Sequence, residues 1–190
     1  HEEFELYYQP ICNLADGCIA GFEALIRWRH PTDGMIQPID FLRLTEQTSL
    51  IGELGLWTLE RACRDWPVLK QYTRYKSPFI SVNLSPNQLT SESLVDDVKA
   101  IMGRHAMPPA ELKLELTETV MVEYPEIAAR ILEKLAELGT SLALDDYGTG
   151  HSGLKNLQRY PVGTLKIDRV FIEPITGSAQ STEIVRSSID

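Results

Sequence analysis

Two adjacent carboxylates are the first feature of the sequence that could do chemistry. Asp145 and Asp146 end a short apolar run within Ser141–Gly150 (SLALDDYGTG), and glycines follow at positions 148, 150 and 153. This pattern is typical of the carboxyl end of a buried strand in an α/β protein, where the next loop carries functional groups. Because neighbouring ionised carboxylates repel each other, we expect a cation between them. The sequence therefore predicts a divalent metal at this strand end.

Further oxygen ligands follow other apolar stretches of the chain. Glu23, Asn83 and Glu115 are of the hard oxygen type that suits Mg²⁺ or Mn²⁺ better than zinc or copper. Four carboxylates are more than one ion needs. The set therefore favours two ions bridged by Asp145, an arrangement that can hydrolyse a phosphodiester.

Two cationic residues could complete such a site. Arg27 shares the expected face of Glu23 and could clamp a phosphate. Lys166 could orient or deprotonate an attacking water, or hold developing negative charge.

Four of the candidates also have an ordinary structural explanation. Asp146 alone fits a turn residue, Glu118 a helix N-terminal carboxylate and Lys166 a solvated lysine. Asn83, followed by Ser85 and a proline, fits a simple turn. Five strands that each present a polar group on one face are hard to obtain from turns and caps alone, because a buried row of unpaired charges is costly. This convergence favours a functional site.

The elements that must position these residues alternate along the chain. The first two strands, Glu5–Ile11 and Ile19–Trp28, are joined by a short turn and must pair antiparallel. Strands are also expected at Phe79–Leu84, Leu112–Thr117, Ser141–Asp145 and Thr164–Asp168. Helices are expected at Phe41–Gln47 with Asp40 as N-cap, Ile51–Trp66 ending at Pro67, Ser91–His105, Pro125–Leu138, Ser152–Arg159 and from about Ser181. Repeated βα units predict a mostly parallel sheet with helices outside.

Alternation along the strands separates a polar face from an apolar one. The polar face carries Gln9, Glu23, Arg27, Asn83, Glu115, Asp145 and Lys166. We therefore predict an α/β fold, a TIM-like (β/α) barrel with an antiparallel first strand and these residues at its mouth. Such a barrel needs eight strands and about 250 residues, whereas six strands are counted here. We expect a single domain over residues 1–190 that lacks the last strands, in preference to an open sheet with exposed edges.

Composition narrows the class of protein. A net charge of −9 and a pI near 5.0 argue against a nucleic-acid polymer as ligand. The sequence has no apolar run long enough to span a membrane and no signal peptide, which predicts a cytoplasmic location. Three cysteines without a C-x-x-C spacing favour reduced thiols over a disulfide framework or zinc site.

Several motifs resemble one known family. Glu23-Ala24-Leu25 is the signature tripeptide of the EAL domain, the bacterial phosphodiesterases that hydrolyse cyclic di-GMP to linear pGpG. The resemblance extends to YYQPI (Tyr7–Ile11), FEALIRWRHP (Phe22–Pro31), VNLSPNQL (Val82–Leu89), LELTE (Leu114–Glu118), LDDYGTGHSGL (Leu144–Leu154) and LKIDRVFI (Leu165–Ile172). The family fold is a barrel whose first strand runs antiparallel.

The resemblance implies roles for individual residues. It implies two Mg²⁺ or Mn²⁺ ions held by Glu23, Asn83, Glu115, Asp145 and Asp146. It implies that Lys166 is the active-site lysine, that Gln9, Leu25 and Arg27 contact substrate, and that Glu118 anchors the loop Asp146–Leu154, which couples metal binding to dimerisation. Lys166, Glu23 and Glu118 are therefore the expected catalytic set.

The resemblance also sets expectations for the whole protein. Family members usually form homodimers and follow sensory and GGDEF domains, so this domain could be the cytoplasmic part of a membrane-anchored protein. Tyr147, His151 and Gly153 replace the commoner Phe, Tyr and Ser of the loop. The family's seventh strand carries another active-site Glu and its eighth a substrate-facing Gln. We therefore expect the natural protein to be active and this polypeptide alone to turn over substrate poorly.

Two alternatives remain open. A non-catalytic receptor would bind cyclic di-GMP without cutting it, although such receptors tend to lose groups that this sequence retains. An enolase-type barrel, with Lys166 abstracting a proton, would leave Arg27 and the paired aspartates without a role.

Overall fold

One curved sheet organises the computed structural model, which describes residues 3–41, 50–117, 121, 123–147, 159–175, 177, 182–183 and 185–186. The seven strands run in the order β1-β2-β4-β5-β6-β7, with β3 beside β2. They are β1 (Phe4–Cys12), β2 (Ile19–His30), β3 (Gly34–Ile36), β4 (Phe79–Asn83), β5 (Leu112–Thr117), β6 (Ser141–Tyr147) and β7 (Thr164–Ile167). The helices are α2 (Leu50–Leu69), α3 (Leu94–Arg104), α5 (Pro125–Glu137) and α7 (Arg169–Ile172), with 3₁₀ turns η1 (Lys70–Tyr72), η2 (Gln88–Thr90) and η3 (Pro109–Glu111).

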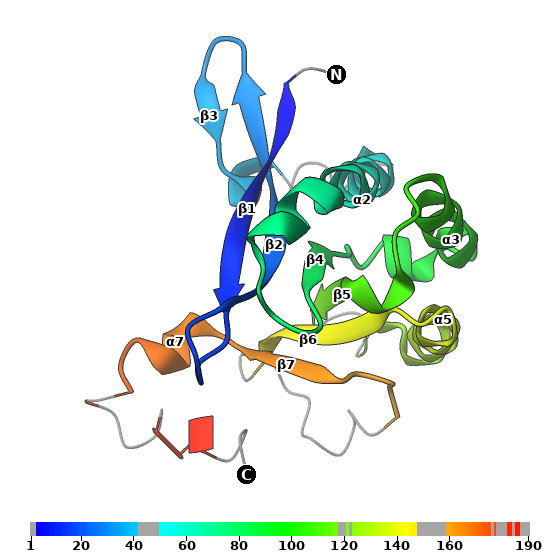
Figure 1. Cartoon of the computed structure of the whole chain (residues 1–190). Coiled ribbons are helices and arrows are strands. Elements are labelled where there is room, and N and C mark those ends of the chain that lie inside the picture. Colours follow the sequence, from blue (N-terminus) through cyan, green and yellow to red (C-terminus); the bar gives the residue numbers. More distant parts are fainter. Residues whose placement is uncertain are drawn as a thin grey trace.

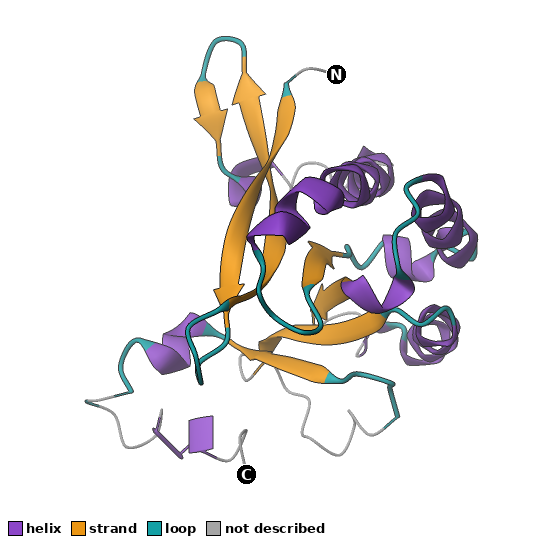
Figure 2. Cartoon of the chain, in the orientation of Figure 1, coloured by secondary structure: helices purple, strands orange, loops and turns teal. Residues whose placement is uncertain are grey.

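The strand directions confirm the predicted α/β fold. The β1–β2 hairpin is antiparallel, from Phe4 opposite Trp28 to Cys12 opposite Ile19. Each later pair along the path, from β2–β4 to β6–β7, is parallel. Parallel neighbours need crossover connections, and α2, α3 and α5 supply those from β2 to β6 on one side of the sheet (Figures 1 and 2). This is the arrangement of a TIM-like (β/α) barrel with a reversed first strand.

The hydrophobic core lies between the sheet and these helices. Ile80 and Val82 of β4 and Leu114 of β5 are fully buried, as the alternation predicted. They pack in one cluster with helix residues such as Leu59 of α2 and Leu132 of α5. Burying one such side chain stabilises the fold by about 1.5–3 kcal/mol, so the helices fix the sheet's outer face and leave its inner face for polar residues.

The sheet formed by the described residues is open. The strand path runs from β1 at one edge to β7 at the other, and these two strands are not paired with each other. None of the helices in the described part of the chain is both long and apolar enough to cross a membrane.

Several predicted boundaries are wrong. Residues 38–41 are already helical, so Asp40 is not the N-cap; Pro38 is suited to a first helical turn because its missing N–H has no partner to lose there. Helix α2 continues through Pro67 to Leu69. The last turn is held because Trp66 and Lys70 both donate hydrogen bonds to the Glu111 carboxylate, at 2.7 and 2.5 Å.

Other elements were shifted or missed. Helix α3 begins at Leu94 because the 3₁₀ turn η2 precedes it, and β6 continues to Tyr147. The short β3 and α7 were not predicted. Asp168 ends no strand: its carboxylate accepts a 2.7 Å hydrogen bond from Val170 N and caps α7. The predicted helices beyond Phe41 and over Ser152–Arg159 lie almost wholly outside the described residues.

Gly21 of β2 is paired with Phe79 of β4 and leaves no room for a side chain. A Cβ at this position would lie 2.4 Å from the Phe79 carbonyl oxygen and 2.9 Å from its ring. We predict that Gly21→Ala lowers the free energy of unfolding by about 1–3 kcal/mol, the usual cost of overpacking, because a backbone oxygen cannot move aside. Urea denaturation measures the change. Gly52→Ala is the control, since nothing lies within 4 Å of its Cβ position, and equal stability of the two variants would contradict the prediction.

Candidate active site

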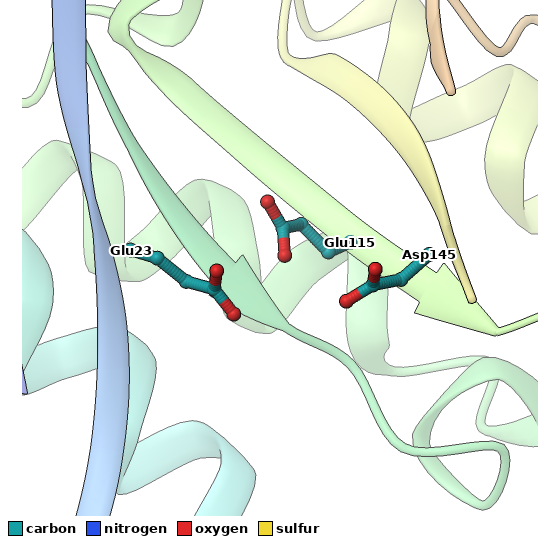
Figure 3. A group of neighbouring side chains, drawn as sticks. All are labelled: Glu23, Glu115 and Asp145. Atoms are coloured by element: carbon teal, nitrogen blue, oxygen red, sulfur yellow. The ribbon is translucent and has the colours of Figure 1, made fainter. Parts of the chain in front are cut away.

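Three carboxylates converge on the inner face of the sheet. They belong to Glu23 of β2, Glu115 of β5 and Asp145 of β6, and one oxygen of each lies within 4.8 Å of the others (Figure 3). The Glu115 side chain is 1% exposed, whereas those of Glu23 and Asp145 are 16% and 22% exposed. The trio therefore has a buried floor and an open side that a ligand can reach.

Lys166 of β7 forms ion pairs with all three carboxylates and offsets part of their charge. Its Nζ lies 3.1 Å from Glu23 Oε2, 2.5 Å from Glu115 Oε2 and 2.8 Å from Asp145 Oδ2. Burial alone would lower the pKa of Lys166, but hydrogen bonds to Asp145 and Glu115 outweigh it and raise the pKa above its usual value. The ammonium thus stays charged at neutral pH, which disfavours the role of general base and favours that of a fixed positive charge.

The protonation of Glu115 depends on its burial and on the charges of Glu23 and Lys166 beside it. Burial raises the pKa of Glu115, and repulsion from Glu23 adds to the shift, while Lys166 opposes it. A raised carboxyl pKa means that the native protein holds this proton more tightly than the unfolded chain does. The metal-free protein therefore loses this stabilisation as the pH rises from the unfolded value of about 4.3 through the folded value.

The same shift predicts a pH dependence of metal binding. A carboxyl group must lose its proton to bind a cation, so the apparent Mg²⁺ affinity should rise by up to about tenfold per pH unit until Glu115 is ionised. Isothermal titration calorimetry between pH 5 and 8 tests this. Glu115→Gln should flatten the profile, and a wild-type affinity that is constant over this range would contradict the prediction.

Asn83 lies beside the trio at the end of β4. Its Nδ2 donates a 3.0 Å hydrogen bond to Glu23 Oε1, and β4 and β5 place Asn83 opposite Glu115. The structure thus brings together four of the five predicted metal ligands.

Asp146 is separate from the trio. Its φ of 55° is left-handed, a conformation that Asp tolerates better than most residues, and its backbone N–H donates to Asp145 Oδ1 at 2.9 Å. Burial raises the pKa of Asp146, and repulsion from Asp145 and Asp168 adds to the shift. Asp168, the cap of α7, is thus a neighbour of the site that sequence reasoning missed. Its position two residues after Lys166 was the available signal.

The predicted substrate-contacting residues lie on the β1–β2 hairpin, which also carries Glu23 of the trio. Gln9 lies opposite Glu23, and Leu25 lies opposite Tyr7. The Arg27 guanidinium donates to the Ile26 carbonyl at 2.8 Å and lies 5.5 Å from the centroid of the Tyr7 ring. Tyr7, 49% exposed, was not predicted as a site residue. An aromatic residue on the same strand face as Gln9 was the signal in the sequence that could have indicated it.

A cavity of about 250 Å³ adjoins the trio. It lies where β2 and β4 diverge beyond their paired residues, and its walls come from Leu25, Pro38, Leu54, Asn83, Pro86 and Thr117 among others. The cavity is mainly apolar, as expected for a pocket that receives a flat organic group. Glu118, and the loop Asp146–Leu154 beyond Tyr147, lie outside the described residues.

The whole chain matches a family model. Residues 1–190 match the model of the EAL domain. The chain belongs to the EAL domain family. The family is the one indicated by the tripeptide Glu23-Ala24-Leu25, and in this EAL domain the tripeptide places Glu23 in the carboxylate trio.

Curated relatives share this EAL domain along nearly its full length. An uncharacterized signaling protein of Caulobacter vibrioides is 42% identical over 97% of the chain, which covers 22% of that protein. The cyclic di-GMP phosphodiesterase NbdA of Pseudomonas aeruginosa is 40% identical over 99% of the chain, which covers 24% of NbdA. The EAL domain thus spans about a quarter of the length of these relatives.

Solved structures agree with the fold. The PaMucR phosphodiesterase in complex with c-di-GMP is 38% identical, with a TM-score of 0.90 over 98% of this chain and 75% of that chain. The EAL enzyme Bd1971, bound to cAMP and cyclic di-GMP, is 34% identical, with a TM-score of 0.91 over 99% of this chain and 52% of that chain.

The donor set of the EAL domain fits a hard divalent cation. The carboxylates of Glu23, Glu115 and Asp145 and the amide of Asn83 converge, and each of these four groups has an oxygen atom that can bind a metal. The clustered groups include no thiol and no imidazole, the ligands that softer metals prefer. A single ammonium now offsets only part of their negative charge, so a doubly charged ion would compensate that charge better. The residues present are therefore compatible with Mg²⁺ or Mn²⁺.

Proposed function

We propose that this EAL domain hydrolyses one phosphodiester bond of cyclic di-GMP to yield linear pGpG, with the aid of divalent metal. The observation that carries the proposal is the convergence of Glu23, Glu115 and Asp145 on the inner face of the sheet. The similarity to NbdA, named as a cyclic di-GMP phosphodiesterase, and to PaMucR in complex with c-di-GMP supports the substrate.

Four residues would hold the metal. Glu23, Asn83, Glu115 and Asp145 would supply oxygen ligands from the four parallel strands β2, β4, β5 and β6, and Asp146 would serve a second ion from the exit of β6. When bound, Mg²⁺ or Mn²⁺ would polarise the phosphoryl group and lower the pKa of an attacking water.

Lys166 would stabilise negative charge on the phosphate. Its high pKa keeps it cationic, and its position on β7 aims the ammonium at the metal ligands. A fixed charge of this kind favours the transition state because it needs no rearrangement during the reaction. We assign Glu118 the expected role of anchoring the loop after β6.

The hairpin residues would orient the substrate. Arg27 can offer two N–H groups to a phosphate, while Gln9 supplies amide hydrogen bonds beside Glu23. Leu25 and the adjoining cavity would take an apolar or aromatic part of the ligand. Together they would fix one phosphodiester bond over the trio.

Further proposals concern the location, oligomeric state and regulation of the whole protein. We expect it to be a cytoplasmic homodimer, or the cytoplasmic part of a membrane-anchored protein, regulated by sensory or GGDEF domains. Size-exclusion chromatography with light scattering tests the dimer.

Turnover and binding separate the enzyme from a receptor. Full-length protein is incubated with cyclic di-GMP and either Mg²⁺ or EDTA; chromatography measures pGpG, and calorimetry with Ca²⁺ or EDTA measures affinity. We expect more than one molecule of pGpG to form per molecule of protein, and only with Mg²⁺. Tight, metal-independent binding without any pGpG would instead identify a receptor.

A further inference from the structure

The turn after β4 contains a closed ring of hydrogen bonds. Gln88 Oε1 accepts from Ser85 N at 3.0 Å and from Ser85 Oγ at 3.1 Å. In return, Ser85 Oγ accepts from Gln88 N at 3.3 Å. This is the reciprocal pattern of a capping box, S-x-x-Q, and here it closes the turn that immediately follows Asn83.

The Gln88 side chain is also seated against helix α2. Gln88 is 5% exposed, and a Cβ on Gly55 would lie 2.2 Å from its Oε1 and 2.4 Å from its Nε2. The orientation of the amide is fixed, because a backbone N–H such as that of Ser85 can only donate and must face the oxygen. The oxygen therefore holds the turn, and Gly55 provides the space that the amide needs.

The ring fixes the chain on one side of Asn83. On the other side, residues Ile80–Val82 of β4 are held in register with β5. Between Asn83 and the ring, Leu84 N donates to Glu115 O at 2.8 Å. Asn83 lies between these two anchors and reaches Glu23 with its amide. The same cavity is lined by Gly55, Asn83, Ser85 and Gln88. The ring of hydrogen bonds therefore lies next to the proposed metal ligand Asn83.

We propose that Ser85, Gln88 and Gly55 form a positioning device that holds Asn83 at the metal site. Among the described residues, no hydrogen bond or ion pair joins these three to the carboxylate trio, so they would act through Asn83. The inference rests on the proposed function, since it assumes that Asn83 is a metal ligand. Mutating a residue that orients a metal ligand commonly lowers metal affinity by about 10–100-fold.

Two glycines of α2 provide a matched test. Alanine is a better helix former than glycine, so propensity alone predicts a higher unfolding temperature for both Gly52→Ala and Gly55→Ala. A Cβ at Gly52 meets nothing within 4 Å, whereas one at Gly55 displaces the Gln88 amide. In the full-length protein we expect Gly55→Ala to raise the Mg²⁺ dissociation constant about tenfold and Gly52→Ala to leave it unchanged.

A double-mutant cycle assigns the effect to Gln88. Gln88→Ala alone should weaken Mg²⁺ binding about tenfold, and adding Gly55→Ala should cause no further loss, because the clash is gone. Ser85→Ala adds no volume and removes the two hydrogen bonds of the Ser85 hydroxyl but keeps the one from Ser85 N, so it should weaken Mg²⁺ binding less than Gln88→Ala does. Ser85→Thr restores the hydroxyl and should recover binding. These variants serve if Gly55→Ala does not fold.

The NMR signal of the Asn83 side-chain amide gives a readout without metal. We expect it to shift in metal-free Gly55→Ala and Ser85→Ala, and to stay in place in Gly52→Ala. Wild-type affinity, or an unmoved Asn83 signal, in both Gly55→Ala and Ser85→Ala would overturn the proposal. If the wild type bound no divalent metal, the metal part of the proposed function would fail, and the Asn83 signal alone would decide the positioning role.

Discussion

Replacing Asp145 with asparagine is expected to lower kcat for cyclic di-GMP hydrolysis by about a thousand-fold, the scale of losing one group that stabilises transition-state charge. Asparagine keeps the volume of the side chain but removes the negative charge that would bind metal and that now pairs with Lys166 at 2.8 Å. The loss should appear in kcat, measured by pGpG formation at saturating substrate.

The Asp145 variant needs a control for charge and fold. Asp96→Asn makes the same change on an exposed residue of α3 and should retain wild-type turnover. Circular dichroism should show native secondary structure for both variants. If Asp145→Asn retained more than about a tenth of wild-type kcat, the residue would not be a metal ligand in the reaction, because loss of a transition-state contact costs far more.

Replacing Lys166 with methionine is the second change with a large expected effect. It leaves three carboxylates without their cation, one of them 1% exposed. Breaking a buried ion pair typically costs about 3–5 kcal/mol, and because Lys166 is 27% exposed we expect about 3 kcal/mol at pH 7. Turnover should also fall by about a hundred-fold or more, since the fixed charge is lost.

Metal and pH should each rescue the stability of Lys166→Met. At pH 5 protonation of Glu115, whose pKa is already raised by burial, relieves the repulsion, so the variant should lose less stability there than at pH 7. Saturating Mg²⁺ should stabilise the variant more than the wild type. Urea denaturation in EDTA and in Mg²⁺ measures both effects, with Lys99→Met on exposed α3 as control. An equal stability loss at both pH values and in both buffers would show that Lys166 does not compensate the trio.

The sequence was sufficient for the sheet because its strands obey a strong local rule. In β5, Leu114 and Leu116 alternate with polar residues, and both are buried as predicted. The same alternation placed Glu115 on the inner face, and the parallel order of strands then brought Glu23 and Asp145 to it. Regular spacing and strand order thus determine most of the candidate site.

Features that depend on tertiary contacts could not be predicted. The alternation put Lys113 on the polar face, yet its Nζ lies 3.8 Å from the centroid of the Phe79 ring, and burial lowers its pKa. The continuation of α2 past Pro67 depends on Glu111, which is more than forty residues away in the chain. Such contacts leave no periodic pattern in the sequence. The contact of Lys166 with three carboxylates is of the same kind.

Lys166 gives the metal-free site a definite electrostatic state. Three carboxylates around one ammonium leave a net negative charge, and a divalent cation would compensate it better than a lysine does. Metal binding would therefore compete with the contacts of Lys166. The ammonium would then be available to a phosphate at the open side of the trio.

Anomalous diffraction from crystals soaked in Mn²⁺ tests the central claim most directly. We predict an anomalous peak between Glu23, Glu115 and Asp145, with Asn83 as a neighbour and with Lys166 no longer in contact with all three carboxylates. Crystals that show no peak at saturating Mn²⁺, with Lys166 still bound to all three carboxylates, would contradict the account of these residues as a metal centre.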